Sequence, residues 1–294
     1  MYKRKIMTGY YRHKKGKIYR VLCEAKHSET CDPLVVYQAM YDKGEVWVRP
    51  KEMFFEKGRF IPLEESEALK IIPIEFNPKF RFPDIDYKDE KIPLIDDGSL
   101  SKNVKAMKTL LTKLGIVNEN LFNGIDNDDD LEQFIIDRIK AYNAGDDFEE
   151  IFHLIQIWGG NSGRGIYVFG EGCKWDEIAP HYQELVKTCL ETKDISESSI
   201  DNLVKVVREV DKSIKNLGVS FITKHTRYWL YRNLELNALP IYDSIMANYV
   251  MQKAIDIKDL QEYWTVMIAK ANQLEIGLVP LERQIFKYAY ERIS

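Results

Sequence analysis

The chain has 294 residues, of which 45% are hydrophobic and 30% charged, and a formal net charge of −4. This is an ordinary globular composition, and the length is sufficient for two domains with buried cores. The near-neutral charge argues against indiscriminate binding to nucleic acid. No apolar run approaches the roughly 20 residues that cross a bilayer, and no apolar segment follows the charged N-terminus as it does in a secretory signal. We therefore expect a cytoplasmic monomer without membrane association.

Four cysteines are spread along the chain, with neither Cys-x-x-Cys spacing nor the density of a disulfide scaffold. We expect these residues to be free thiols in a reducing compartment: Cys23, Cys31, Cys173 and Cys189. Their spacing also excludes the tight cysteine group that an iron–sulfur cluster requires. His13 and His27 lack the acidic or cysteine neighbours that would complete a metal site. The sequence therefore predicts no metal and no cofactor.

Residues 8–60 are predicted to form a small β domain. Segments 17–23, 34–41 and 45–49 are rich in β-branched and aromatic residues and are separated by turn residues. The runs Thr8-Gly-Tyr-Tyr-Arg-His-Lys-Lys-Gly and Trp47-Val-Arg-Pro-Lys-Glu-Met-Phe resemble a small bacterial domain of uncharacterised function (DUF1653-like). The resemblance covers the whole segment and implies a compact SH3-like β-barrel with Tyr37, Trp47 and Phe54 in its core. It implies no activity.

Charge is distributed unevenly along the chain. Residues 1–60 carry 14 Lys or Arg against 7 Asp or Glu, whereas residues 61–150 carry 11 against 21. The first 20 residues contain eight basic side chains and no acidic one. Such a basic surface is compatible with DNA binding, and Lys14 and Lys15 are candidate phosphate contacts. A solvated charged face is the alternative interpretation.

Residues 61–98 are predicted to form a Pro-rich connector between two domains. Five of the ten prolines lie in this segment. The apolar runs at 71–76 and 80–82 predict that the connector crosses the second domain rather than acting as a free linker.

Residues 99–294 are predicted to form an all-α domain, which makes the whole chain an α+β multidomain protein. Apolar residues recur at helical spacing almost throughout this part. The expected helices cover residues 104–114, 131–139, 147–158, 175–190, 196–216, 223–233, 243–255, 259–272 and 281–292.

The segment from Leu217 to Asp243 contains the strongest functional signal. Its sequence is Leu-Gly-Val-Ser-Phe-Ile-Thr-Lys-His-Thr-Arg-Tyr-Trp-Leu-Tyr-Arg-Asn-Leu-Glu-Leu-Asn-Ala-Leu-Pro-Ile-Tyr-Asp. We predict a glycine turn, a helix that begins near Thr223 and Lys224, and Asp243 as the N-cap of a later helix. This pattern resembles the helix-hairpin-helix DNA glycosylases, specifically the 8-oxoguanine branch. In that family a lysine opens the helix after the hairpin and an aspartate caps a helix nineteen residues later, a spacing that Lys224 and Asp243 keep.

The resemblance implies that Lys224 and Asp243 are catalytic. A lysine amine can attack the sugar carbon of a nucleotide, displace the base and hold the sugar as a Schiff base. A nearby carboxylate can stabilise the cationic sugar of the transition state. Because a duplex hides that carbon, such an enzyme must first flip the nucleotide out.

Further candidates lie around this pair. Gly218 and Thr223 at the turn, with Arg227, are predicted to contact DNA, since backbone N–H groups at a helix N-terminus can hold a phosphate. The predicted walls of a base pocket are Trp158, Phe221, His225 and Tyr242. The glycine-rich run Trp158-Gly-Gly-Asn-Ser-Gly-Arg164-Gly indicates a loop whose backbone closely approaches another group. By resemblance this loop would border the base pocket or the DNA, with Arg164 on the DNA side; a structural turn with a capping arginine is the alternative.

Two functions are therefore compared. The first is a DNA glycosylase, bifunctional through a lysine Schiff base, that excises a damaged or modified base from double-stranded DNA. The second is a non-catalytic DNA-binding or protein-interaction module that retains the glycosylase fold. The second is motivated by the turn, because the family's Gly-Val-Gly is replaced here by Gly218-Val-Ser-Phe-Ile. It predicts that Lys224 is exposed, or salt-bridged away from Asp243.

Overall fold

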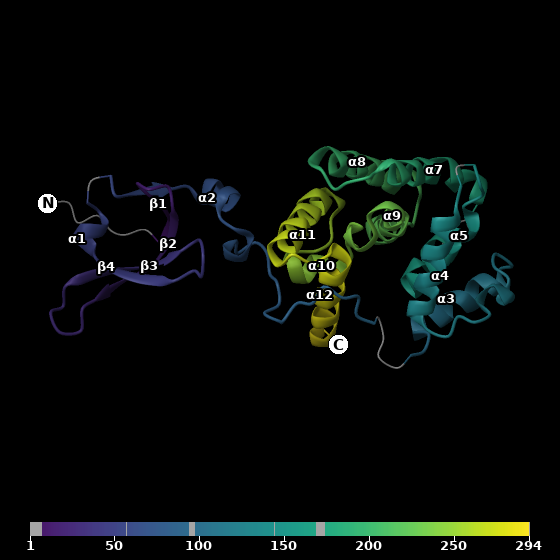
Figure 1. The fold of residues 1–294 in the computed structure, drawn as a ribbon, viewed down its shortest axis with the longest axis horizontal. Coiled ribbons are helices and arrows are strands. Elements are labelled where there is room, and N and C mark those ends of the chain that lie inside the picture. Colours follow the sequence, from purple (N-terminus) through teal and green to yellow (C-terminus); the bar gives the residue numbers. More distant parts are fainter. Residues whose placement is uncertain (1–7, 57, 94–97, 144, 169–173, 294) are drawn as a thin grey trace. The chain divides into compact units, whose positions relative to one another are not determined.

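The computed structural model describes residues 8–56, 58–93, 98–143, 145–168 and 174–293. The chain divides into two compact units, Met1–Arg81 and Phe82–Ser294. The first contains a β-sheet and the second is helical, as the α+β prediction expects (Figure 1). Among the described residues, none of the helices combines the length and apolar character needed to span a bilayer. Cys23, Cys31 and Cys189 are free thiols, and Cys173 lies outside the described residues.

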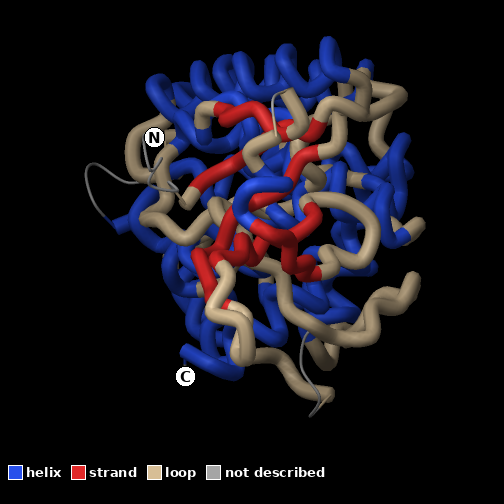
Figure 2. Tube along the Cα trace, turned by 90° about the vertical axis from the view of Figure 1, so that its left-hand side faces the viewer, coloured by secondary structure: helices blue, strands red, loops and turns tan. Residues whose placement is uncertain are grey.

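Unit 1 is built on one five-stranded antiparallel sheet, with strand order β4-β3-β2-β1-β5. All strands of the described chain belong to this sheet (Figure 2). Its elements are β1 (Gly9–His13), β2 (Ile18–Lys26), β3 (Pro33–Ala39), β4 (Val46–Pro50), α1 (Lys51–Phe54), β5 (Phe60–Leu63), α2 (Glu65–Ile71) and the 3₁₀ turn η1 (Ile74–Phe76). The three strands predicted from composition correspond to β2, β3 and β4.

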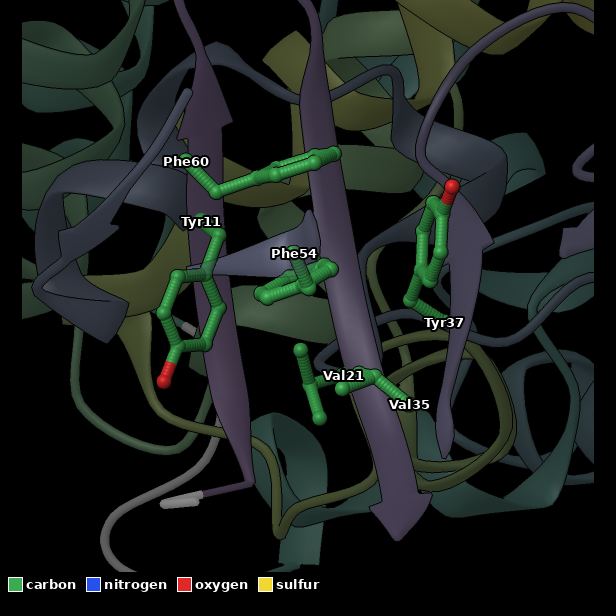
Figure 3. Close-up of a cluster of buried hydrophobic side chains, with 6 residues drawn as sticks. All are labelled: Tyr11, Val21, Val35, Tyr37, Phe54 and Phe60. Carbon is green, nitrogen blue, oxygen red and sulfur yellow. The ribbon is translucent and has the colours of Figure 1, made fainter. Parts of the chain in front are cut away.

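The sheet buries side chains on both faces, because neighbouring residues of a strand point to opposite sides. Tyr11 packs with Phe54 and Phe60 on one face, where these two phenylalanine rings stack at 4.1 Å between centroids (Figure 3). Tyr10 packs on the other face with Ala68 of α2 and its neighbours. Each short helix thus closes one side of the sheet.

Two expectations for unit 1 need correction. Tyr37 and Phe54 are buried as predicted, but Trp47 is 49% exposed, because β4 is an edge strand and this side chain lies outside both cores. The strands form a five-stranded antiparallel sheet with β4 and β5 at its ends, an order that is compatible with the SH3-like barrel, which stays a prediction. The structure also places residues 60–76 in unit 1, as β5, α2 and η1, although the sequence favoured a connector there.

Unit 2 consists of helices joined by short turns. The helices are α3 (Lys102–Lys113), α4 (Asp128–Ala141), α5 (Glu149–Trp158), α6 (Gly165–Val168), α7 (Trp175–Glu191), α8 (Glu197–Ser213), α9 (Gly218–Leu234), α10 (Ser244–Val250), α11 (Leu260–Leu274) and α12 (Leu278–Ile293). Four 3₁₀ turns lie between them: η2 (Glu119–Phe122), η3 (Asn161–Arg164), η4 (Glu235–Asn237) and η5 (Ile257–Asp259).

Helix α9 is the centre of unit 2. It is contacted by α4, α5, α7 and α8 and is seen nearly end-on among the other helices in Figure 1. Every residue from Phe221 to Leu230 is buried, polar ones included. The prediction that this helix begins near Thr223 is wrong by about a turn and a half. It begins at Gly218, and the link to α8 is only residues 214–217, in which Asn216 has a φ of 64°.

The extended segment 82–93 lies along α12. The Gln284 side chain accepts from the Lys88 backbone N–H at 2.9 Å and donates to the Lys88 carbonyl at 2.8 Å. Asp89 accepts from the Gly277 N–H at 2.8 Å, and Arg283 donates to the Ile92 carbonyl at 2.7 Å. This segment is therefore a fixed part of unit 2.

The core of unit 1 gives a first prediction. Phe54 is fully buried and stacks on Phe60, so Phe54→Ala should lower the free energy of unfolding of unit 1 by about 3–5 kcal/mol. The preceding residue, Met53, is 50% exposed, and Met53→Ala should change it by less than about 0.5 kcal/mol. Amide hydrogen exchange of β1 to β3 measures both values in the full chain. Equal effects of the two substitutions would contradict the packing described here.

Candidate functional site

One cavity of unit 2, about 550 Å³ in volume, is lined by both Lys224 and Asp243. Its wall is formed by the end of α5 and the following glycine loop, by α9, by the start of α10 and by α12. Trp158 and Arg227 also line it. The structure therefore brings together four of the residues singled out in the sequence, from helices α5 and α9 and from the residue that precedes α10.

Lys224 lies in the second turn of α9 and is buried. Its Nζ atom donates to the Ser220 hydroxyl at 2.9 Å, one helical turn earlier, and lies 4.6 Å from the centre of the Phe221 ring. Burial lowers the pKa of Lys224 below the ordinary lysine value, and the negative charges of Asp243 and Glu282 oppose this effect. The net lowering means that the neutral amine is more accessible than on an exposed lysine.

Asp243 is the N-cap of α10, as the sequence predicts. Its side chain accepts the Met246 backbone N–H at 2.9 Å, which satisfies one of the free donors at the helix start. The carboxylate influences Lys224 through space, while the Lys224 amine donates to Ser220. The two charged groups therefore line the same cavity without a direct ion pair between them among the described contacts.

The corner before Asp243 is fixed by three side chains from other elements. The Thr223 hydroxyl accepts the Tyr242 N–H at 3.0 Å, which ties the corner directly to α9. Tyr263 and Trp264 of α11 donate to the carbonyl groups of residues 241 and 240, at 2.8 and 2.9 Å. Asp243 thus has a defined position relative to Lys224 before any ligand binds.

The glycine loop approaches Phe221. A Cβ atom on Gly159 would lie 2.3 Å from the Phe221 ring, and one on Gly163 would lie 2.4 Å from it. Gly159 and Gly163 therefore form a glycine slot that holds the Phe221 ring, and the ring lies next to the Lys224 side chain. The close approach predicted from the four glycines is real, but its partner is a side chain of α9. Trp158, Gly159, Gly160 and Ser162 reach the cavity wall.

Buried ion pairs form the far wall of the cavity. Arg227 pairs with Glu282 of α12, and both side chains are at least 94% buried. Arg283 pairs with Glu132 of α4 and with Asp129 at 3.2 Å. Arg227 Nη2 and Trp158 Nε1 are buried donors without a hydrogen-bond partner among the described residues. Unpaired buried donors are costly, and both atoms are closed to solvent in the described structure.

Three of the four predicted base-pocket residues do not line the cavity. Phe221 lies behind Lys224, in the glycine slot. His225 is fully buried on another side of α9, where it bonds to Gln156 at 2.9 Å and Tyr182 at 2.8 Å, and burial lowers its pKa. Tyr242 is fully buried against Tyr263. Of the predicted walls, only Trp158 lines the cavity.

The predicted DNA contacts are scattered. Thr223 and Arg227 are almost fully buried and already bonded, so neither is available to a phosphate on the surface. Gly218 and Arg164 are exposed but are not cavity residues. Lys14 and Lys15 are exposed on unit 1.

Sequence reasoning missed Ser220, Glu282 and Arg283. Ser220 precedes Lys224 by four residues and Arg227 follows it by three, so all three share one face of α9. The signal for α12 was a Glu-Arg pair inside the otherwise apolar run at 278–285, which indicates charges that must be paired internally. In the described part of the chain, no group of three or more His, Cys, Asp or Glu side chains is placed to hold a metal ion.

Comparison with known proteins adds one match. Residues 9–61 match the family described as a protein of unknown function (DUF1653). This match covers the sheet of unit 1 through β4, α1 and the first residues of β5, and bears out the resemblance noted for that segment. No curated protein and no solved structure matches the chain.

The glycine slot gives a second prediction. Gly159→Ala should destabilise unit 2 by about 1–3 kcal/mol, because the new methyl group would overlap the Phe221 ring while the backbone, at φ −64°, accepts alanine readily. In a Phe221→Leu background the same substitution should cost at least about 1 kcal/mol less, because the ring is absent. A double-mutant cycle of chemical denaturation, followed by helix circular dichroism, measures the difference. Equal costs in both backgrounds would show that Gly159 does not act through Phe221.

Proposed function

We propose that unit 2 is a DNA glycosylase that removes a damaged or modified base from double-stranded DNA, with Lys224 as nucleophile. The observation that carries the proposal is the buried Lys224 of lowered pKa, which shares one cavity with the carboxylate of Asp243. A volume of about 550 Å³ is within the usual range of small-ligand sites, so one flipped nucleotide fits it.

The proposed reaction assigns a separate task to each residue. Neutral Lys224 Nζ forms a bond to C1′ of the sugar, the glycosidic bond breaks, and the base leaves with the electron pair and takes up a proton. The nitrogen then loses a proton, its electron pair forms the C=N bond as the C1′–O4′ bond breaks, and O4′ takes up a proton, which gives the protonated Schiff base. Asp243 stabilises the positive charge that develops on the sugar in the transition state. Ser220, which accepts from Lys224 Nζ, orients the amine.

The cavity wall supports binding of a polar base. Arg227 Nη2 and Trp158 Nε1 are donors that lack a partner in the described structure, and nucleobases carry carbonyl and ring-nitrogen acceptors. Ile241, Phe286 and Val104 supply apolar surface in the same cavity. A planar ligand with acceptors on its edge is complementary to this combination.

The alternative function is a non-catalytic module that retains the fold. It predicts that Lys224 is exposed or paired away from Asp243. Instead, Lys224 is 9% exposed and donates to the hydroxyl of Ser220. A lysine in an ordinary structural role would gain stability from an ion pair or from solvent, and this residue has neither. The geometry therefore favours the enzyme.

The third prediction concerns the nucleophile. On a duplex that carries the substrate base, borohydride should trap the protein covalently, and Lys224→Gln should abolish trapping. Because burial lowers the pKa of Lys224, the trapping rate should reach its plateau at a pH below the ordinary lysine pKa of about 10.4. A panel of damaged and modified bases identifies the substrate.

The matched control is Lys215→Gln, which removes an exposed lysine from the turn that precedes α9. This variant should be trapped as efficiently as the wild type. Trapping of Lys224→Gln at the wild-type rate would eliminate Lys224 as the nucleophile, and a uniform loss in both variants would indicate an effect on DNA binding instead.

The fourth prediction separates the two roles of Asp243. Asparagine caps a helix about as well as aspartate, so Asp243→Asn should leave thermal stability and DNA affinity nearly unchanged. Single-turnover base excision should fall by roughly two orders of magnitude, because the charge acts mainly in the transition state.

Asp256→Asn is the matched control for this experiment. Asp256 caps the short turn η5 by accepting the Lys258 N–H at 3.0 Å and is not a cavity residue. It should excise at the wild-type rate. Excision by Asp243→Asn within a fewfold of wild type would leave Asp243 as a helix cap and remove it from the mechanism.

A further inference from the structure

A second hollow, about 530 Å³ in volume, lies on unit 1, where the β1–β2 hairpin approaches the start of β5. Five cationic side chains line it: Lys14, Lys15, Lys17, Arg49 and Arg59. No carboxylate is among its described lining residues. Glu56 lies outside the lining and pairs with Arg59 at 2.5 Å, which leaves the other four cations without an acidic partner in the wall.

The cations converge on one region. Burial lowers the pKa of His13, and the positive charges of Arg59, Lys14, Lys15 and Arg49 lower it further. Four of the five cations therefore act on the same imidazole at short range. Like charges held together in this way repel each other, and a polyvalent anion in the hollow would remove that repulsion.

The backbone around the hollow is fixed. The Lys14 N–H donates to the Arg59 carbonyl at 2.9 Å, which joins the hairpin to β5. The His13 N–H donates to the Lys17 carbonyl at 2.9 Å, and Gly16 completes the tight turn with a φ of 89°. The three lysines of the hairpin are therefore presented from a rigid turn rather than from a loose loop.

The remaining wall is aromatic. Lys17 Nζ lies 4.3 Å from the centre of the Tyr41 ring, and Arg49 Nε donates to the Tyr37 hydroxyl at 3.2 Å. The hydroxyls of Tyr19 and Tyr41 are 2.5 Å apart. Only one of these two protons can lie between the oxygens, so the other hydroxyl proton is directed elsewhere and can serve a ligand oxygen.

We propose that this hollow binds a nucleoside phosphate, with the phosphate held by Lys14, Lys15, Lys17 and Arg49 and the nucleoside against Tyr19 and Tyr41. A phosphate monoester carries a charge of about −1.5 to −2, which suits several cations better than one carboxylate does. The volume is far larger than a lone phosphate needs and is typical of organic ligands. Aromatic rings beside cations are the usual surface for a nucleoside with its phosphate.

Two ligands carry a nucleoside with a terminal phosphate: a free mononucleotide and the phosphorylated end of a single DNA strand. Titration calorimetry of the full-length chain with adenosine 5′-monophosphate, and with a short 5′-phosphorylated oligonucleotide, distinguishes them. The Lys224→Gln chain is used throughout, so that no covalent adduct forms in unit 2. Binding by unit 1 is then the part that a substitution in its hollow removes, whether or not unit 2 is a glycosylase.

The test compares two variants that each lose two exposed positive charges from unit 1. Lys15→Ala with Lys17→Ala removes cations of the hollow, and Lys26→Ala with Lys43→Ala removes cations outside it. We expect at least tenfold weaker binding of the nucleotide or the strand by the first variant and a change within twofold by the second. All four lysines are exposed, and thermal unfolding verifies that both variants fold.

Binding of either probe with this pattern supports the proposal, and the probe that binds identifies the source. The proposal is overturned if the wild-type hollow binds neither probe, or if both double variants weaken binding equally. It is also overturned if adenosine without phosphate, inorganic phosphate alone or polyglutamate binds as tightly as the best nucleotide probe.

Discussion

The middle of helix α9, from Phe221 to Leu230, is buried, and a buried polar side chain is costly unless it finds a partner inside the protein. Thr223 bonds to the corner before α10, His225 to two side chains of α5 and α7, and Thr226 to a carbonyl of its own helix. Arg227 forms an ion pair with α12. Lys224 is a charged residue with little compensation, since its amine donates to a single serine hydroxyl and its side chain lines a cavity. A buried cation with so little compensation is the kind of group that proteins keep for a function.

The surroundings of Lys224 are held in place by contacts between several elements. Two glycines hold the Phe221 ring behind it, and three hydrogen bonds fix the corner that carries Asp243. Phe221 and Thr223 belong to α9, and the other two donors to the corner, Tyr263 and Trp264, belong to α11. The relative position of amine and carboxylate therefore depends on the packing of these two helices and does not require a ligand. Catalytic groups held in advance in this way avoid reorganisation during the reaction.

Apolar periodicity was sufficient to predict the described helices of unit 2 except α6 (Gly165–Val168), because periodicity reflects which face is buried, and β-branched and aromatic composition predicted three strands of unit 1. Prediction from the sequence failed at positions where contacts with other helices determine the local backbone structure. Gly218 has the positive φ of 66° that suits the predicted glycine turn, but α9 begins at this residue rather than near Thr223. That shift matters for the site, because neighbours on a helix face are three or four residues apart and depend on which residues are helical. With α9 starting at Gly218, Ser220 and Arg227 fall beside Lys224, while His225 turns away into the core.

The cavities of the two units differ in how their charged side chains are compensated. In the cavity of unit 2, buried Arg227 is neutralised by Glu282, so the wall carries little net charge and only Lys224 is poorly compensated. In the hollow of unit 1, several cations stand together without carboxylates in the wall. The arrangement in unit 2 suits a reaction at a single atom, because the Lys224 amine lacks an ion-pair partner among the described residues while the neighbouring Arg227 is paired with Glu282. The arrangement in unit 1 suits attraction of an anion, because uncompensated charge in a concave surface acts on the whole ligand. The overall net charge of −4 reveals neither of these two local charge arrangements. The distribution of charge along the chain was therefore more informative than the net charge.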